Sequence, residues 1–114
     1  MFRYGLLCAG VLASMLNIQP AAALSGREYL QLDAANRSLH VMGMVEAMKY
    51  TDDLSGTNSL KWLFQCAGSW TGVQFEQALS DYIQRNRYKL SYRTPSLLVS
   101  AVGSQCPNAP MWAR

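Results

Sequence analysis

The chain has 114 residues, of which 50% are hydrophobic and 15% are charged, and its formal net charge at pH 7 is +3. This length is enough for one small domain and no more. Residues 24–114 carry nine basic and seven acidic side chains, a net charge of +2. That balance is too weak to predict a polyanionic partner, so we expect no nucleic-acid binding.

Residues 1–23 have the pattern of a secretory signal peptide. Arg3 gives a short positive start, an almost uncharged apolar run follows over residues 4–16, and the segment ends in Ala21, Ala22 and Ala23. The apolar run has about 13 residues, fewer than the roughly 20 that span a bilayer. We therefore expect cleavage after Ala23, no stable membrane anchor and a periplasmic location.

The cysteines predict a disulfide. Removal of the leader would remove Cys8 and leave Cys66 and Cys106, an even count in a compartment that oxidises thiols. A metal site is the rival interpretation, but His40 is the only histidine, and two thiolates with one imidazole make a poor zinc site. We expect no metal and no cofactor.

The first predicted helix begins at a capping box formed by Ser25 and Glu28. Apolar residues then recur near helical spacing to residue 48, which fits either one long helix or two pieces broken near Asn36. Turn-forming residues at 52–58 end it. Gly43 lies inside this helix, where glycine costs about 1 kcal/mol relative to alanine. We expect a neighbouring helix to approach closely there.

A short apolar segment, residues 60–64, predicts one or two helical turns. A second capping box, Thr71 with Gln74, begins the most strongly amphipathic helix of the sequence. Asn86 is expected to end that helix in a left-handed conformation.

The last predicted helix begins with Thr94 as its cap and Pro95 at its first position, and it ends at Cys106. It should run back alongside the preceding helix, which would bring Cys66 and Cys106 together. The sequence therefore predicts an all-α fold: a small bundle of about four helices with one disulfide. Residues 24–114 form a single domain, in which 107–114 are an irregular tail.

The basic and aromatic tract at residues 85–93 is the strongest candidate for a functional surface. In one interpretation it is a helix-ending bend, in which Tyr88, Leu90 and Tyr92 pack inward while the alternating charged residues face water. In another it binds a partner, because exposed Arg and Tyr are enriched at interaction hot spots. Attachment to an anionic lipid or glycan is a third interpretation. The candidate contact residues are Arg85, Arg87, Tyr88, Lys89, Tyr92 and Arg93.

Enzymatic motifs do not occur in the sequence. It has no nucleophile-elbow motif, no glycine-rich phosphate loop and no cluster of metal ligands. The adjacent carboxylates Asp52 and Asp53 are better explained as turn formers than as an acid/base pair. We expect a protein that is not an enzyme.

The C-terminal half resembles the small periplasmic immunity proteins that act against type VI secretion amidase effectors. The residues that carry this resemblance are Cys66, Tyr82-Ile83, Leu97-Leu98 and Cys106. The segment around Gly43 is similar to the aromatic-x-x-Gly turn of that family, with His40 in the aromatic place. The resemblance implies an all-helical exported domain that binds and blocks a peptidoglycan-cleaving amidase. It assigns structural roles alone to Gly43, Cys66 and Cys106.

Two other functions are consistent with the same features. One is a periplasmic helical chaperone of the acid-stress type, in which protonation of carboxylates releases apolar surface. The other is a cell-envelope assembly factor with a different protein partner. A homodimer is compatible with each of these functions.

Overall fold

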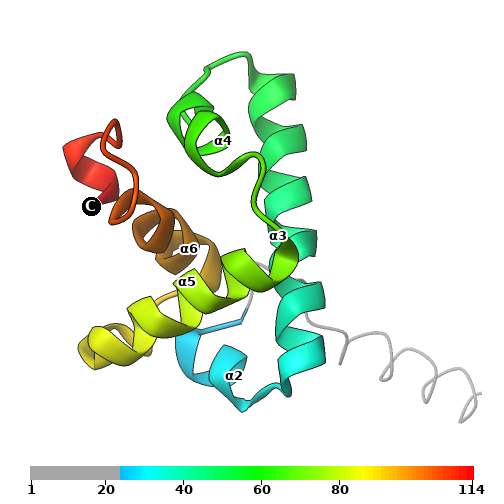
Figure 1. The fold of residues 1–114 in the computed structure, drawn as a ribbon, viewed down its shortest axis with the longest axis vertical. Helices are drawn as coiled ribbons and strands as arrows, with labels where there is room; N and C mark the ends of the chain where they lie inside the picture. The colour runs from blue at the N-terminus through cyan, green and yellow to red at the C-terminus, as the bar shows by residue number, and fades with distance from the viewer. Residues whose placement is uncertain (1–23) are drawn as a thin grey trace, which may run out of the picture.

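The computed structural model describes residues 24–114. The predicted signal peptide and its cleavage after Ala23 lie outside the described residues. The described part of the chain is all-α, as the sequence predicts (Figure 1). None of the helices within residues 24–114 combines the length and hydropathy of a membrane span. Its helices are α2 (Gly26–Gln31), α3 (Ala34–Ser55), α4 (Lys61–Ala67), α5 (Gly72–Arg85) and α6 (Thr94–Gly103), with short 3-10 helices η2 (Arg87–Lys89) and η3 (Met111–Ala113).

Both predicted capping boxes are present, at Ser25 before α2 and at Thr71 before α5. The chain breaks between α2 and α3 at Asp33, earlier than the expected position near Asn36. The cause is a side-chain cap, because a carboxylate oxygen of Asp33 accepts a hydrogen bond from the backbone N–H of Asn36 at 2.8 Å.

The core lies where α5 crosses α3 and packs on α6 (Figure 1). The side chains that α5 contributes follow the predicted stripe and are buried: Phe75, Ala78, Leu79, Tyr82 and Ile83. The expected antiparallel arrangement of α5 and α6 is wrong, because the two helices diverge toward their C-terminal ends (Figure 1).

The disulfide joins Cys66 and Cys106, with a Cα–Cα distance of 6.0 Å. Cys66 precedes α5, as predicted, and lies within α4, so the bond connects α4 directly to the chain that leaves α6. The predicted pairing is confirmed, but its position follows from the packing of α4 on α6 and not from an antiparallel helix pair.

A polar network connects α2, α3 and α5. One carboxylate oxygen of Glu76 accepts hydrogen bonds from Arg37 Nε at 2.8 Å, from the Tyr29 hydroxyl at 3.4 Å and from Ser80 Oγ. Tyr29 is fully buried, and this burial raises the pKa of its hydroxyl well above the usual value. Hydrogen-bond partners from three helices offset the desolvation of the Glu76 carboxylate.

The close approach predicted at Gly43 does not occur. Gly43 is exposed, and a β-carbon built there would have no heavy atom within 4 Å. The residues that α3 buries in the core, Val41, Met44 and Val45, lie toward the other side of the helix. Close packing occurs instead at Gly103, where a β-carbon would collide with the backbone oxygen of Ala113.

The tail is more ordered than the sequence predicts. Residues 111–113 form η3, and Ala113 is buried against Gly103. The Arg114 guanidinium donates hydrogen bonds to the carbonyl oxygens of Ala109 at 3.1 Å and Pro107 at 3.0 Å. The tail therefore folds back on the end of α6.

Loss of the disulfide is expected to destabilise the domain strongly. The cross-linked cysteines are separated by 40 residues, and the chain-entropy treatment gives roughly 4 kcal/mol for a loop of that size. Reduction should lower the melting temperature, followed by circular dichroism, by more than about 15 °C. A variant with Cys66→Ser and Cys106→Ser should melt at the lower temperature with or without reductant. An unchanged melting temperature after reduction would contradict this assignment.

Two glycine substitutions should have opposite effects on stability. Gly43→Ala should raise the free energy of unfolding by about 1 kcal/mol, because the site is an exposed helix interior with open space around it. Gly103→Ala should lower it, because η3 must move to make room for the new methyl group. Urea unfolding of the two variants checks both signs, and a destabilised Gly43→Ala protein would show that this side of α3 is not open.

Candidate functional site

The predicted bend at residues 85–93 begins where α5 ends. The side-chain amide of Asn86 donates to the carbonyl oxygen of Tyr82 at 2.8 Å, and its backbone N–H bonds the carbonyl oxygen of Ile83. The φ angle of Asn86 is −127°, so the predicted left-handed terminus is wrong. The carbonyl groups in the last turn of α5 need hydrogen-bond donors, which a left-handed residue would provide through the backbone. Here the Asn86 side chain is the donor for one of them. The chain then enters η2.

The first described residues hold the far end of this bend. The Gly26 N–H donates to the carbonyl oxygen of Tyr92 at 2.9 Å, and the Thr94 N–H donates to that of Leu24 at 2.9 Å. A β-carbon at Gly26 would lie 2.9 Å from the Leu97 side chain, so glycine permits this close approach. Residues 24–27, which we call the N-terminal clamp, therefore fix the position of the bend.

Thr94 has a different role from the one predicted. Arg93 occupies the N-cap position of α6 and makes no side-chain cap hydrogen bond, whereas Thr94 is the first helical residue and is fully buried. The Thr94 hydroxyl donates to the carbonyl oxygen of Leu24 at 3.2 Å. Thr94 is therefore part of the hydrogen bonding to the N-terminal clamp. The residues next to it in the sequence could not predict this role, because its partner is 70 residues away.

Lys89 lies among three tyrosine rings at the centre of the bend. Its ammonium nitrogen is 5.2, 5.7 and 6.0 Å from the ring centroids of Tyr82, Tyr88 and Tyr92, all within cation–π range. It also donates a hydrogen bond to the Tyr82 hydroxyl at 2.6 Å. We call these four residues the tyrosine–lysine corner.

The electrostatics of the corner favour the charged form of Lys89. The hydrogen bond to Tyr82 is the main cause that raises the pKa of the ammonium above its usual value, although partial burial acts in the opposite direction. Lys89 therefore remains positively charged at neutral pH while it orients the tyrosine rings.

The predicted alternation of buried aromatic and exposed charged residues is wrong for three of its members. Tyr88 and Tyr92 are 75% and 49% exposed, Lys89 is half-buried, and Leu90 packs against the core as expected. For Tyr88 and Lys89 the cause is η2, because a 3-10 helix has three residues per turn and not the two-residue repeat of an extended chain. The exposure of the Tyr88 and Tyr92 rings favours the interpretation in which the bend binds a partner over the one in which these rings pack inward.

The three arginines of the tract, Arg85, Arg87 and Arg93, are exposed along the same bend. Arg85 Nε donates to the carbonyl oxygen of Asp81 at 3.3 Å, and the positive charge of Arg93 contributes to the lowered pKa of Glu28, whose main cause is hydrogen bonding to Ser25. Of the six predicted contact residues, five are therefore exposed along the bend, and Lys89 is half-buried.

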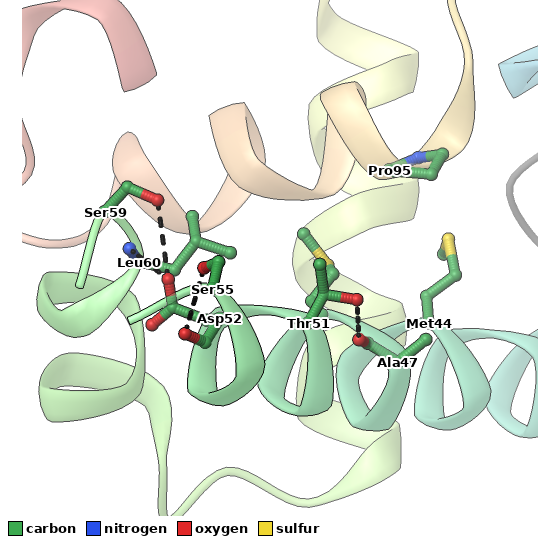
Figure 2. Close-up of a pocket in the computed structure, with 9 residues that line it drawn as sticks. Met44, Ala47, Thr51, Asp52, Ser55, Ser59, Leu60 and Pro95 are labelled. Carbon is green, nitrogen blue, oxygen red and sulfur yellow. Dashed lines mark hydrogen bonds between the residues drawn. The ribbon is translucent and has the colours of Figure 1, made fainter. Parts of the chain in front are cut away.

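A second concave feature, which the sequence reasoning missed, lies between α3 and the start of α6. It is a groove of about 310 Å³, lined by Met44, Ala47, Met48, Thr51, Asp52, Ser55, Ser59, Leu60 and Pro95. Met44 and Thr51 project from α3 toward the side on which Pro95 lies (Figure 2). Methionines at residues 44 and 48 were the available signal, because flexible thioether side chains are typical of adaptable binding surfaces.

Asp52 forms the polar edge of this groove. One of its carboxylate oxygens accepts hydrogen bonds from the Leu60 N–H at 3.3 Å and from Ser59 Oγ at 3.4 Å (Figure 2). It therefore orders the turn between α3 and α4, which is the role that the sequence predicts. Within residues 24–114 no three His, Cys, Asp or Glu side chains gather as a metal site would require.

A scan against protein-family models finds no match to the chain, and neither do searches of curated proteins and of solved structures. The kinship with amidase immunity proteins therefore stays a prediction, and the function must be argued from the geometry of the domain.

Lys89 should make the stability of the domain depend on alkaline pH. Because its pKa is raised in the folded state, its stabilising contribution is fully present below the unfolded-chain pKa of about 10.4 and is lost as pH rises through the higher folded value. Lys89→Met should cost about 1 kcal/mol at pH 7 and flatten the fall in melting temperature between about pH 9 and pH 12. Lys61→Met, at an exposed lysine in α4, should keep the wild-type pH profile. Identical profiles for all three proteins would contradict the corner geometry.

Proposed function

We propose that the chain is an exported, non-catalytic binding protein that neutralises a peptidoglycan amidase effector in the periplasm, and that the tyrosine–lysine corner is its contact surface. The observation that carries the proposal is the exposure of Tyr88 and Tyr92 beside Lys89 on a bend that the N-terminal clamp fixes.

Pre-organisation favours this surface for binding. The rings of Tyr88 and Tyr92 are large and have few rotatable bonds, and contact with Lys89 restricts them before a partner arrives. Less conformational entropy is then lost on association, so more of the contact energy contributes to affinity. Exposed tyrosine and arginine side chains are also the types in which hot spots are enriched.

Charge defines the chemistry of the partner. Arg85, Arg87 and Arg93 are exposed on the same bend as the tyrosine–lysine corner and give it positive charge, which complements an acidic rim around a substrate cleft. A domain that covers such a cleft blocks access to peptidoglycan without any catalytic group of its own. The choice of an amidase rests on the resemblance of residues 37–106 to the immunity family, and the disulfide suits an oxidising compartment.

Binding and inhibition by the oxidised domain, residues 24–114, test the proposal. The domain should capture an amidase from periplasmic or culture-fluid extracts in a one-to-one complex and stop its cleavage of purified peptidoglycan. Tyr88→Ala combined with Tyr92→Ala should weaken the complex at least about 30-fold, the effect expected for hot-spot residues. Tyr50→Ala, which removes a comparably exposed tyrosine from α3, is the matched control and should bind normally.

Other outcomes would contradict the proposal in distinguishable ways. Capture of a protein that does not cleave peptidoglycan would exclude amidase neutralisation and favour an envelope assembly factor. Suppression of client aggregation only below about pH 3–4, where carboxylates become protonated, would favour the acid-stress chaperone. Equal loss of binding in Tyr50→Ala would move the contact away from the tyrosine–lysine corner.

A further inference from the structure

The groove between α3 and the start of α6 follows a single stripe of α3. The lining residues from that helix recur at intervals of three and one, so their side chains leave the same side of it: Met44, Ala47, Met48, Thr51, Asp52 and Ser55. Met44 and Ala47 lie toward one end of the groove, and Asp52 and Ser55 lie toward the other (Figure 2). The groove therefore has an apolar end and a polar end, about 12 Å apart along the helix axis.

The hydroxyl groups of the lining have their protons engaged within the protein. Thr51 Oγ1 donates to the carbonyl oxygen of Ala47 at 2.8 Å. Ser55 Oγ donates to the carbonyl oxygen of Asp52 at 3.1 Å, and Ser59 Oγ donates to Asp52 Oδ1 at 3.4 Å. A hydroxyl group has one proton and two lone pairs, so each of the three can still accept a hydrogen bond but has no proton left to donate. The polar side chains of the groove therefore offer acceptors alone.

Asp52 is the one charged side chain in the lining of the groove. The hydrogen bonds that its carboxylate accepts from the Leu60 N–H and from Ser59 both reach Oδ1. Within residues 24–114, no lysine or arginine nitrogen lies within ion-pair distance of this carboxylate. The polar end of the groove thus carries a negative charge that the described part of the chain does not pair.

We propose that the groove binds a small amphiphile with an apolar body and a single cationic head group. The body lies along Met44, Ala47 and Met48, where the flexible thioether side chains adapt to its shape. The head donates hydrogen bonds to the carboxylate of Asp52. An ammonium group suits this place because it has three donors, no acceptor and the opposite charge.

The same lining discriminates against an anionic amphiphile. A carboxylate head needs hydrogen-bond donors, and the polar side chains at this end have none to offer. Its oxygens would lose water without gaining partners, and the charge of Asp52 would repel it. A neutral alcohol can donate one hydrogen bond but gains no charge attraction. The expected order of affinity at constant chain length is therefore ammonium, alcohol, carboxylate.

The size of the groove fits a ligand of few atoms. Its volume of about 310 Å³ is at the lower end for small-molecule sites. An alkyl chain of about eight carbons spans the distance from Met44 to Asp52. A ligand of that size should bind with a dissociation constant on the order of 100 μM. The inference does not depend on amidase binding, since neither Tyr88 nor Tyr92 lines the groove.

Titration of the disulfide-bonded domain, residues 24–114, with octylammonium, octanol and octanoate tests the head group at constant chain length. The NMR signals of isotopically labelled methionine methyl groups report the site. Octylammonium should shift the signals of Met44 and Met48 and should bind at least about tenfold more tightly than octanoate, with octanol between them. Met111, which is 88% exposed and outside the groove, is the internal control and should not shift.

Asp52→Asn separates charge from folding. The amide oxygen of asparagine can still accept the hydrogen bonds that order the turn before α4, so the melting temperature should stay near that of the wild type. The affinity for octylammonium should fall about three- to tenfold, while octanol binds as before. Asp53→Asn, at the adjacent exposed carboxylate outside the groove, is the matched control and should bind all three compounds as the wild type does.

Ala47→Phe tests the apolar end. The new ring should fill the groove from an exposed helix position, so all three compounds should lose affinity in a protein whose circular dichroism is unchanged. Octanoate binding as tight as that of octylammonium would overturn the proposal, and so would an equal loss of affinity in Asp53→Asn. Equal shifts of Met111 would overturn it too, because they would show attachment to exposed apolar side chains without a site. So would Met44 and Met48 signals that stay unshifted at millimolar octylammonium.

Discussion

Backbone hydrogen bonds between residues 24–27 and residues 90–94 fix the position of the bend that carries the tyrosine–lysine corner. The N-terminal clamp joins Leu24 to Thr94 and Gly26 to Tyr92, across almost 70 residues of sequence. Backbone N–H and carbonyl groups buried at such a junction need partners, and each segment supplies those of the other. The bend that presents the tyrosine–lysine corner is therefore part of the folded frame and not a free loop.

The clamp and the disulfide together hold α6 at both ends. Thr94, at the start of the helix, bonds Leu24, and Cys106, beyond its end, is linked to Cys66 in α4. Between these points α6 contributes buried side chains to the core that it shares with α5. A domain of this size has a small hydrophobic core. The clamp and the disulfide therefore contribute a large part of the free energy that holds α6 in one position.

Features with local causes could be predicted from the sequence, and features that depend on tertiary contacts could not. The capping boxes at Ser25 and Thr71 and the buried stripe of α5 follow from neighbouring residues, and the cysteine count sufficed for the disulfide. The bend at residues 85–93 was expected between the last two helices and is found there, yet the expected burial of Tyr88 and exposure of Lys89 were reversed, because η2 changes the residue period there. The exposed site of Gly43 depends on which side of α3 faces the core, and residues on both sides of that helix are apolar.

The central claim is that the corner exists in its binding geometry before any partner arrives. Amide hydrogen exchange of the free domain tests this most directly, through the N–H groups of Gly26 and Thr94 that form the N-terminal clamp. The account predicts that both exchange as slowly as the core amides of α5, because they open only when the domain unfolds. Exchange at the rate of an exposed loop, while α5 stays protected, would contradict it.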